Sequence, residues 1–148
     1  MREVIFVSAD EKASRFLELS ARFIQDARVL VRGRRWATAF YIAGYSLECA
    51  LKYAVCVHEN RTVLPKKYRT HRFDIFVDAA GIRREFERPA NARLHGWYRR
   101  VNQLWSESIR YATGGLAPAE VSDSIKIFEE LRKWVLHVTV LRRWSRRR

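Results

Sequence analysis

The C-terminal part of this sequence carries the residues whose chemistry is easiest to interpret. Between Arg132 and Arg148 there are seven cations and no acidic residue, and five arginines, beginning with Arg142 and Arg143, fall in the last seven positions. The guanidinium group offers a planar fork of donors that suits phosphate, and Trp144 among these arginines has a ring on which a base can stack. The segment therefore predicts contact with RNA, a nucleotide or another polyanion. A solvated basic tail would have the same composition, and that alternative stays open.

A second cationic group lies in the segment 60–71, where Pro65 favours a loop. It contains Lys66, Lys67 and Arg69 around the aromatic Tyr68. Cations interleaved with an aromatic ring are typical of a phosphate-contacting patch, and we predict nucleotide or RNA binding here as well. An ordinary solvated loop is the competing interpretation.

Three further residues have side chains that can hold a proton or a metal. Glu48 is a carboxylate in an otherwise apolar stretch, where a buried charge needs a partner, so we expect it to pair with Lys52 or with an arginine of another helix. The alternative for Glu48 is a ligand-facing or proton-handling group. His71 is expected to cap or pack the short helix that follows it. No second Cys/His pair accompanies Cys56 and His58, so no metal and no cofactor are expected.

The composition limits the class of protein that holds these residues. The chain has 148 residues, 48% of them hydrophobic, with only six glycines and three prolines, which favours one globular domain over disorder or a β-sandwich. The net charge is +13, and 23 of the 29 cations are arginine, a bias that polyanion binding or a genome rich in G and C explains equally well.

The sequence also indicates the cellular compartment in which the protein is expected. No uncharged stretch approaches the length of a membrane span, and the start shows no signal peptide. Cys49 and Cys56 are too far apart along one helix to form a disulfide and are predicted to be buried. A cytoplasmic protein is expected.

Helical periodicity dominates the chain. We predict helices over about 10–32, with Ser8 or Asp10 as the cap, over 35–58, over 72–80, from Pro89 to Ile109, and from Pro118 onward. The second is apolar almost all round, which is typical of a central helix, and Gly44 within it predicts close approach of a neighbour. The fold class is all-α, a compact antiparallel bundle of four to five helices in a single domain with a basic C-terminal end at about 142–148.

The second predicted helix also carries a recognisable motif. Its residues fit the pattern A-x-Y-x-A-G-Y-x-x-E-C-x-L-K at Ala39, Tyr41, Ala43, Gly44, Tyr45, Glu48, Cys49, Leu51 and Lys52. This pattern resembles that of HEPN domains found beside small nucleotidyltransferases. Two later segments, Thr70-His71-x-Phe73 and Arg110-Tyr111, are similar to family segments and follow in the family's order.

The resemblance implies two kinds of activity. Some HEPN proteins are metal-independent ribonucleases, usually dimeric, with an arginine and a histidine separated by four to six residues. There, histidine moves the 2′-hydroxyl proton and arginine stabilises the phosphorane charge. Arg132 with His137 and Arg88 with His95 have this spacing. However, a chain so rich in arginine is expected to contain such pairs by chance. At Arg110, where the family's pair would begin, no histidine occurs five to seven residues further on.

The other kind of HEPN protein is a binding or adaptor module. The resemblance then implies a homodimer that contacts a nucleotide, RNA or a nucleotidyltransferase partner in a toxin–antitoxin or defence setting, with Arg110 and Tyr111 among the contacting residues. We expect this non-catalytic function. The alternatives are a ribonuclease that uses Arg132 and His137, and a bundle whose basic end docks on nucleic acid or an anionic surface.

Overall fold

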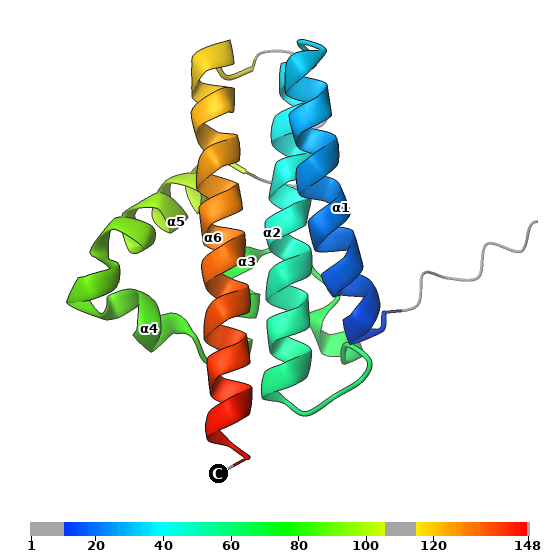
Figure 1. The fold of residues 1–148 in the computed structure, drawn as a ribbon, viewed down its shortest axis with the longest axis vertical. Coiled ribbons are helices and arrows are strands. Elements are labelled where there is room, and N and C mark those ends of the chain that lie inside the picture. Colours follow the sequence, from blue (N-terminus) through cyan, green and yellow to red (C-terminus); the bar gives the residue numbers. More distant parts are fainter. Residues whose placement is uncertain (1–10, 106–114, 148) are drawn as a thin grey trace, which may run out of the picture.

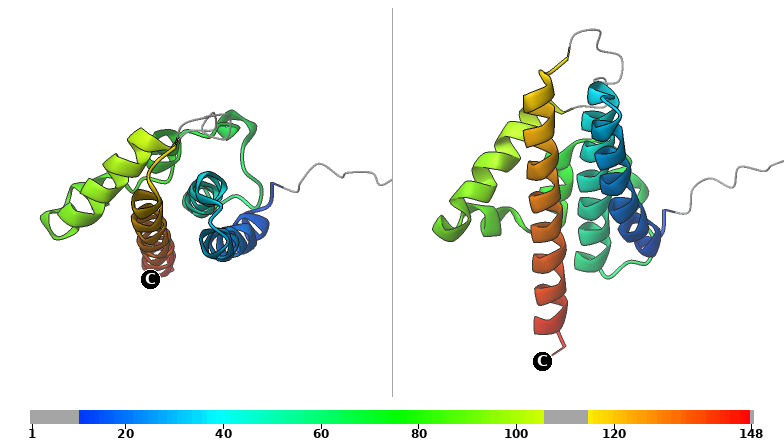
Figure 2. Two further views of the ribbon diagram at one scale, coloured as in Figure 1. Left: turned by 90° about the horizontal axis from the view of Figure 1, so that it is seen from above. Right: turned by 45° about the horizontal axis from the view of Figure 1, so that its top comes forward.

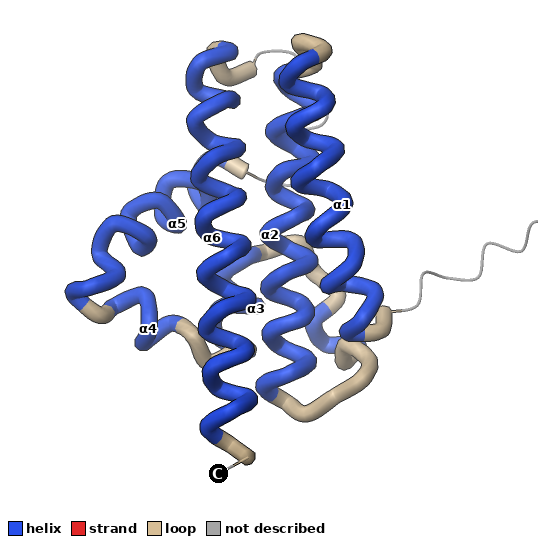
Figure 3. The backbone as a smooth tube through the Cα atoms, viewed as in Figure 1, coloured by secondary structure: helices blue, strands red, loops and turns tan. Residues whose placement is uncertain are grey.

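The computed structural model describes residues 11–105 and 115–147. Over these residues the chain is all-α, as predicted, and contains no β-strand (Figure 3). The elements follow in the order α1 (Ala13–Arg32), α2 (Trp36–His58), the 3-10 turn η1 (Lys66–Tyr68), α3 (Phe73–Ala79), α4 (Arg83–Glu87), the 3-10 turn η2 (Pro89–Asn91), α5 (Ala92–Leu104) and α6 (Pro118–Ser145).

Three long helices, α1, α2 and α6, lie side by side and form the body of the molecule (Figure 1). α1 and α2 are antiparallel, and α6 packs against α2 and runs in the same direction as α2, so the C-terminal ends of α2 and α6 lie at the end of the bundle where α1 begins (Figures 1 and 2). α2 is the central helix, as its composition predicts, and most of its residues are buried.

The shorter helices cover one side of this body. α3 packs against α2, and α5 packs against α6 while extending away from the bundle (Figure 2). Two details differ from the sequence prediction. A short extra helix, α4, lies between Gly81 and Pro89, and the stretch after Pro89 begins with a 3-10 turn before α5. The helix predicted to reach Ile109 ends at Leu104, because Trp105 has extended backbone angles.

The start of the chain's described part is fixed by pairing with the loop after α2. Lys12 forms an isolated antiparallel bridge with Val63, and the amide of Ala13 donates to the carbonyl of Thr62 at 2.8 Å. Lys12 is the N-cap of α1, and the caps predicted at Ser8 and Asp10 lie outside the described residues.

Close packing on α2 depends on Gly44. The indole of Trp105 lies directly against this glycine, and its Nε1 donates to the carbonyl of Tyr41 at 3.1 Å. The same indole stacks on Phe73 with ring centroids 4.8 Å apart. The predicted close approach at Gly44 is therefore present and comes from the residue that ends α5.

The three long helices are also joined by a polar junction. Ser20 and Ser46 each donate from the hydroxyl to the other's carbonyl, at 2.8 and 2.9 Å, and link α1 to α2. Arg132 of α6 donates from Nε to the Ser20 hydroxyl oxygen at 2.8 Å. Both serines are fully buried, so the junction satisfies polar groups at the centre of the bundle.

Candidate functional site

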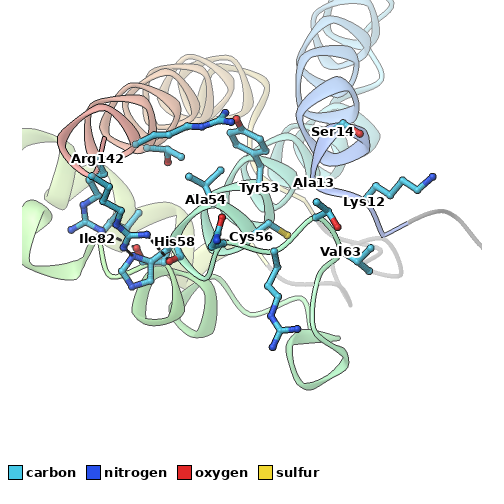
Figure 4. Close-up of a pocket in the computed structure, with 18 of the residues that line it drawn as sticks. Lys12, Ala13, Ser14, Tyr53, Ala54, Cys56, His58, Val63, Ile82 and Arg142 are labelled. Carbon is cyan, nitrogen blue, oxygen red and sulfur yellow. Dashed lines mark hydrogen bonds between the residues drawn. The ribbon is translucent and has the colours of Figure 1, made fainter. Parts of the chain in front are cut away.

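A cavity of about 660 Å³ lies at the end of the bundle where α2 and α6 end and α1 begins. Figure 4 shows Arg142, His58 and Ile82 on one side of it and Lys12, Ala13 and Val63 on the other, with residues of α2 between them. The described residues that line it include six cations and no acidic side chain; the cations are Lys12, Arg61, Arg142, Arg143, Arg146 and Arg147. Such a cavity attracts an anion.

Two of these arginines are held by backbone carbonyls. Arg142 donates from Nη1 to the carbonyl of Ala80 at 2.9 Å and from Nη2 to the carbonyl of Gly81, just beyond α3. Gly81 has φ +67°, a backbone conformation that favours glycine, and a Cβ there would lie 2.9 Å from His58 Cε1. The glycine therefore allows Arg142 and His58 to pack together beside the cavity.

Arg146 is held at the end of α2. It donates from Nη1 to the carbonyl of His58 at 2.9 Å, and its Nη2 lies 3.1 Å from His58 Nδ1. Since a guanidinium group can only donate, Nδ1 accepts and the ring proton sits on Nε2. Burial, together with the charges of Arg146 and Arg142, lowers the pKa of His58 below its usual value, so this histidine is neutral at pH 7. Both arginines neutralise the negative ends of helices.

The remaining three arginines of the cavity differ from Arg142 and Arg146 in their contacts. Arg61, Arg143 and Arg147 are exposed, and their guanidinium groups make no hydrogen bond or ion pair with any described residue. They come from two segments, the loop after α2 and the end of α6. Their charge is therefore available to a bound anion.

The inner wall of the cavity is apolar. Its described lining includes the side chains of Ala54, Cys56 and Ile82, all buried, and the half-buried ring of Tyr53. Burial raises the pKa of the Cys56 thiol to about 11, so the thiol is protonated and behaves as a small apolar group. A ligand that fits this cavity has an anionic group and an apolar or aromatic body.

The predicted loop patch is arranged differently. Lys66, Lys67 and Arg69 do not line the cavity. Arg69 forms an ion pair with Glu11 at 3.3 Å, and the ammonium of Lys67 lies 4.9 Å from the centre of the Tyr68 ring, whose hydroxyl donates to Glu59. Acidic neighbours thus offset part of the charge of this patch. Arg142 and Arg143, predicted from the basic end, line the cavity instead, where Arg142 also lies 3.8 Å from the Glu85 carboxylate.

Glu48 forms a separate polar group in the interior. Its side chain is 1% exposed. Oε1 of Glu48 lies 2.8 Å from His71 Nδ1, at hydrogen-bond distance, and 3.9 Å from Lys52 Nζ. The expected ion pair with Lys52 is present, and His71 also contacts the Glu48 carboxylate. His71 was expected to cap or pack α3; no side chain caps that helix, and the His71 ring contacts Glu48.

Both predicted arginine–histidine pairs fall in the described part of the chain. Arg132 is half-buried and bonded to Ser20, whereas His137 is exposed, as the helical spacing predicts. Arg88 pairs with Glu85 at 3.2 Å, and His95 stacks against Phe86. Within the described residues, no hydrogen bond joins either arginine to its histidine.

Arg110 and Tyr111 lie outside the described residues. In the part of the chain that the structure describes, no group of three or more His, Cys, Asp or Glu side chains could hold a metal ion. The same part contains no helix long and apolar enough to cross a membrane.

Comparison with protein-family models, with curated proteins and with solved structures finds no match to this chain.

Several cavity residues were not singled out from the sequence. Arg61, Tyr53 and Lys12 are far apart from α6 in the sequence, and no local pattern marks them as neighbours of Arg142. Arg147 lies within the basic end that the sequence does mark. The apolar composition of α2 gave no indication that its last turns border a cavity.

Proposed function

We propose that this protein is a HEPN-type helical binding module that contacts phosphate groups of RNA or a nucleotide through the basic cavity. One observation carries the proposal: three exposed arginines without a described partner line a cavity with an apolar inner wall. Arginine is the side chain best suited to phosphate, and charges that are not neutralised within the protein are available to a ligand.

The HEPN part of the proposal rests on the motif residues, whose contacts the structure describes. The motif residues Ala43 and Gly44 are buried in the central helix, and Gly44 receives Trp105. Glu48, Lys52 and His71, which the motifs contain, form one polar group. A homodimer, a nucleotidyltransferase partner and a toxin–antitoxin or defence setting belong to this proposal as properties that the resemblance implies.

A binding function fits the geometry better than RNA cleavage. In the pair on α6, Arg132 is half-buried and bonds Ser20 through Nε, whereas His137 is exposed to solvent. Docking by a flexible basic tail is also less well supported, because Arg142 and Arg146 are fixed to backbone carbonyls.

Fluorescence anisotropy with a labelled single-stranded RNA of about ten nucleotides tests the proposal across a salt series. The double variant Arg143→Gln/Arg147→Gln is expected to bind more weakly, with the slope of log K against log salt smaller by about 1.4, because each lost contact to single-stranded RNA removes about 0.7. Lys66→Gln/Lys67→Gln removes the same charge outside the cavity and is expected to change binding much less.

Equal losses in the two double variants would refute binding at the cavity, and no binding by the unmodified protein would refute the function itself. The RNA recovered after incubation without metal is expected to be intact. Metal-independent cleavage that His137→Ala abolishes would instead establish the ribonuclease alternative.

A further inference from the structure

We propose that the cavity recognises a terminal phosphate monoester on a nucleoside, present either at the end of an RNA strand or on a free mononucleotide. This inference rests on the proposed function and specifies the ligand of the same site. A cavity of this kind binds the phosphorylated end of an RNA strand in preference to the phosphodiester groups within the strand.

The charge of the cavity favours a monoester over a diester. Arg142 and Arg146 already bond the carbonyls of Ala80, Gly81 and His58, so their charge partly offsets helix ends. The guanidinium groups of Arg61, Arg143 and Arg147 remain. A phosphate monoester carries about −1.5 to −2 at pH 7 and three acceptor oxygens, whereas an internal diester carries a single negative charge. Three guanidinium groups that have no partner among the described residues match the monoester.

The size and walls of the cavity favour one nucleotide. A volume of about 660 Å³ falls within the range of about 300–1,000 Å³ that is typical of small-molecule sites. The half-buried Tyr53 and Val57 and the exposed Val63 supply apolar surface for a base (Figure 4). On the other side, the bonds of Glu11 and Ala13 to residues 62–64 hold the loop in place.

An exposed aromatic residue next to Arg143 is available to contact an RNA strand that continues beyond the terminal nucleotide. Trp144 is 68% exposed and does not line the cavity, yet it directly follows Arg143 on α6 and lies one turn before Arg147. Stacking of a base on an exposed aromatic ring contributes substantially to single-strand binding. Trp144 is therefore placed to stack the second base of a strand whose terminal phosphate is in the cavity.

The test compares four RNAs of one ten-nucleotide sequence: with a 5′-phosphate, with a 3′-phosphate, with hydroxyl groups at both ends, and circular. At one fixed salt concentration, at least one phosphorylated RNA is expected to bind about tenfold more tightly than the hydroxyl-ended and circular forms. Arg61→Gln is expected to remove this preference, while Lys67→Gln, a surface control that loses the same charge, keeps it. Circular dichroism verifies that both variants are folded.

Two further measurements separate the sources of the phosphate. Adenosine 5′-monophosphate is used to displace the phosphorylated RNA, and Trp144→Ala is measured with both ligands. If the strand end is the ligand, Trp144→Ala weakens RNA binding severalfold; if the free nucleotide is the ligand, the monophosphate competes at similar concentration and Trp144→Ala leaves its affinity unchanged.

The outcomes also distinguish this inference from the proposed function. Equal affinity for all four RNAs would overturn end recognition and leave RNA binding by the cavity in place. Retention of the phosphate preference in Arg61→Gln would overturn the assignment of the monoester to this cavity. If neither RNA nor the mononucleotide binds, the proposed function fails as well.

Discussion

The substitution Gly44→Ala tests the packing at the centre of the fold. Alanine is the better helix former and stabilises an exposed helix position by about 1 kcal/mol relative to glycine. In this protein, however, a Cβ at position 44 would overlap the indole of Trp105. The indole cannot move aside easily, because it stacks on Phe73 and packs edge-on against Tyr45.

The net effect is expected to be destabilising. Overpacking of a filled core costs about 1–3 kcal/mol, and displacement of the indole leaves its N–H without the Tyr41 carbonyl at a further cost of about 1–3 kcal/mol. After subtraction of the gain in helix propensity, we expect a loss of about 1–5 kcal/mol in the free energy of unfolding. For a chain of this length each kcal/mol lowers the melting temperature by about 2–4 °C.

Urea unfolding followed by circular dichroism measures this loss, and Gly96→Ala is the matched control. Gly96 lies within α5, where a Cβ would meet nothing within 4 Å, so alanine is expected to stabilise the protein there. Opposite signs at the two positions would support the packing described. A Gly44→Ala protein as stable as the unmodified protein, or more stable, would refute the contact between Trp105 and α2.

Two other predictions concern titratable groups. Tyr98→Phe removes the hydroxyl that donates to Asp74. This hydrogen bond is the main cause of the lowered pKa of the Asp74 carboxyl. We expect the substitution to lower the free energy of unfolding by about 1 kcal/mol at pH 7, as measured by urea unfolding. A carboxyl whose pKa is lowered in the folded protein stabilises the fold only while it is ionised. The difference in unfolding free energy between the unmodified protein and Tyr98→Phe should therefore shrink as the pH falls below 3.8. Cys49 and Cys56 have thiol pKa values raised to about 12 and 11 by burial, so iodoacetamide at pH 8 should modify neither in the folded protein and both in urea, as intact mass will show.

A specific outcome would contradict each of these two predictions. A stability difference for Tyr98→Phe that stays constant from pH 7 to pH 2.5 would mean that the hydroxyl does not act through ionised Asp74. Rapid alkylation of either cysteine in the folded protein would mean that the thiol is open to solvent.

Much of the fold could be predicted from the sequence because helices depend on local spacing. The apolar pattern of α2 indicated the central helix, and Gly44 indicated the close contact. The short helix α4 could not be predicted, since its five residues span less than two turns and cannot show a repeated apolar spacing. The end of α5 was also misplaced, because Trp105 continues the apolar spacing while its backbone is extended to reach Gly44.

The candidate site was less accessible to sequence reasoning. Charge alone marked Arg142 and Arg143, but it marked Lys66 and Lys67 equally, and only the fold separates the two groups. Which arginines are available depends on backbone carbonyls at Ala80 and His58, and no side-chain pattern records the position of a carbonyl. The cavity is a product of long-range packing between segments far apart in the chain.

The arrangement of the three long helices bears on the order in which the chain can fold as it is synthesised. α1 and α2 are neighbours in the sequence and can pair as soon as both have left the ribosome, at about 5–20 residues per second. The face of α2 that α6 covers, including Phe40 against Phe128, must wait for nearly ninety further residues, roughly 5–20 seconds at that rate. During that interval the nascent hairpin exposes apolar surface, which makes it a substrate for chaperones and sensitive to premature termination.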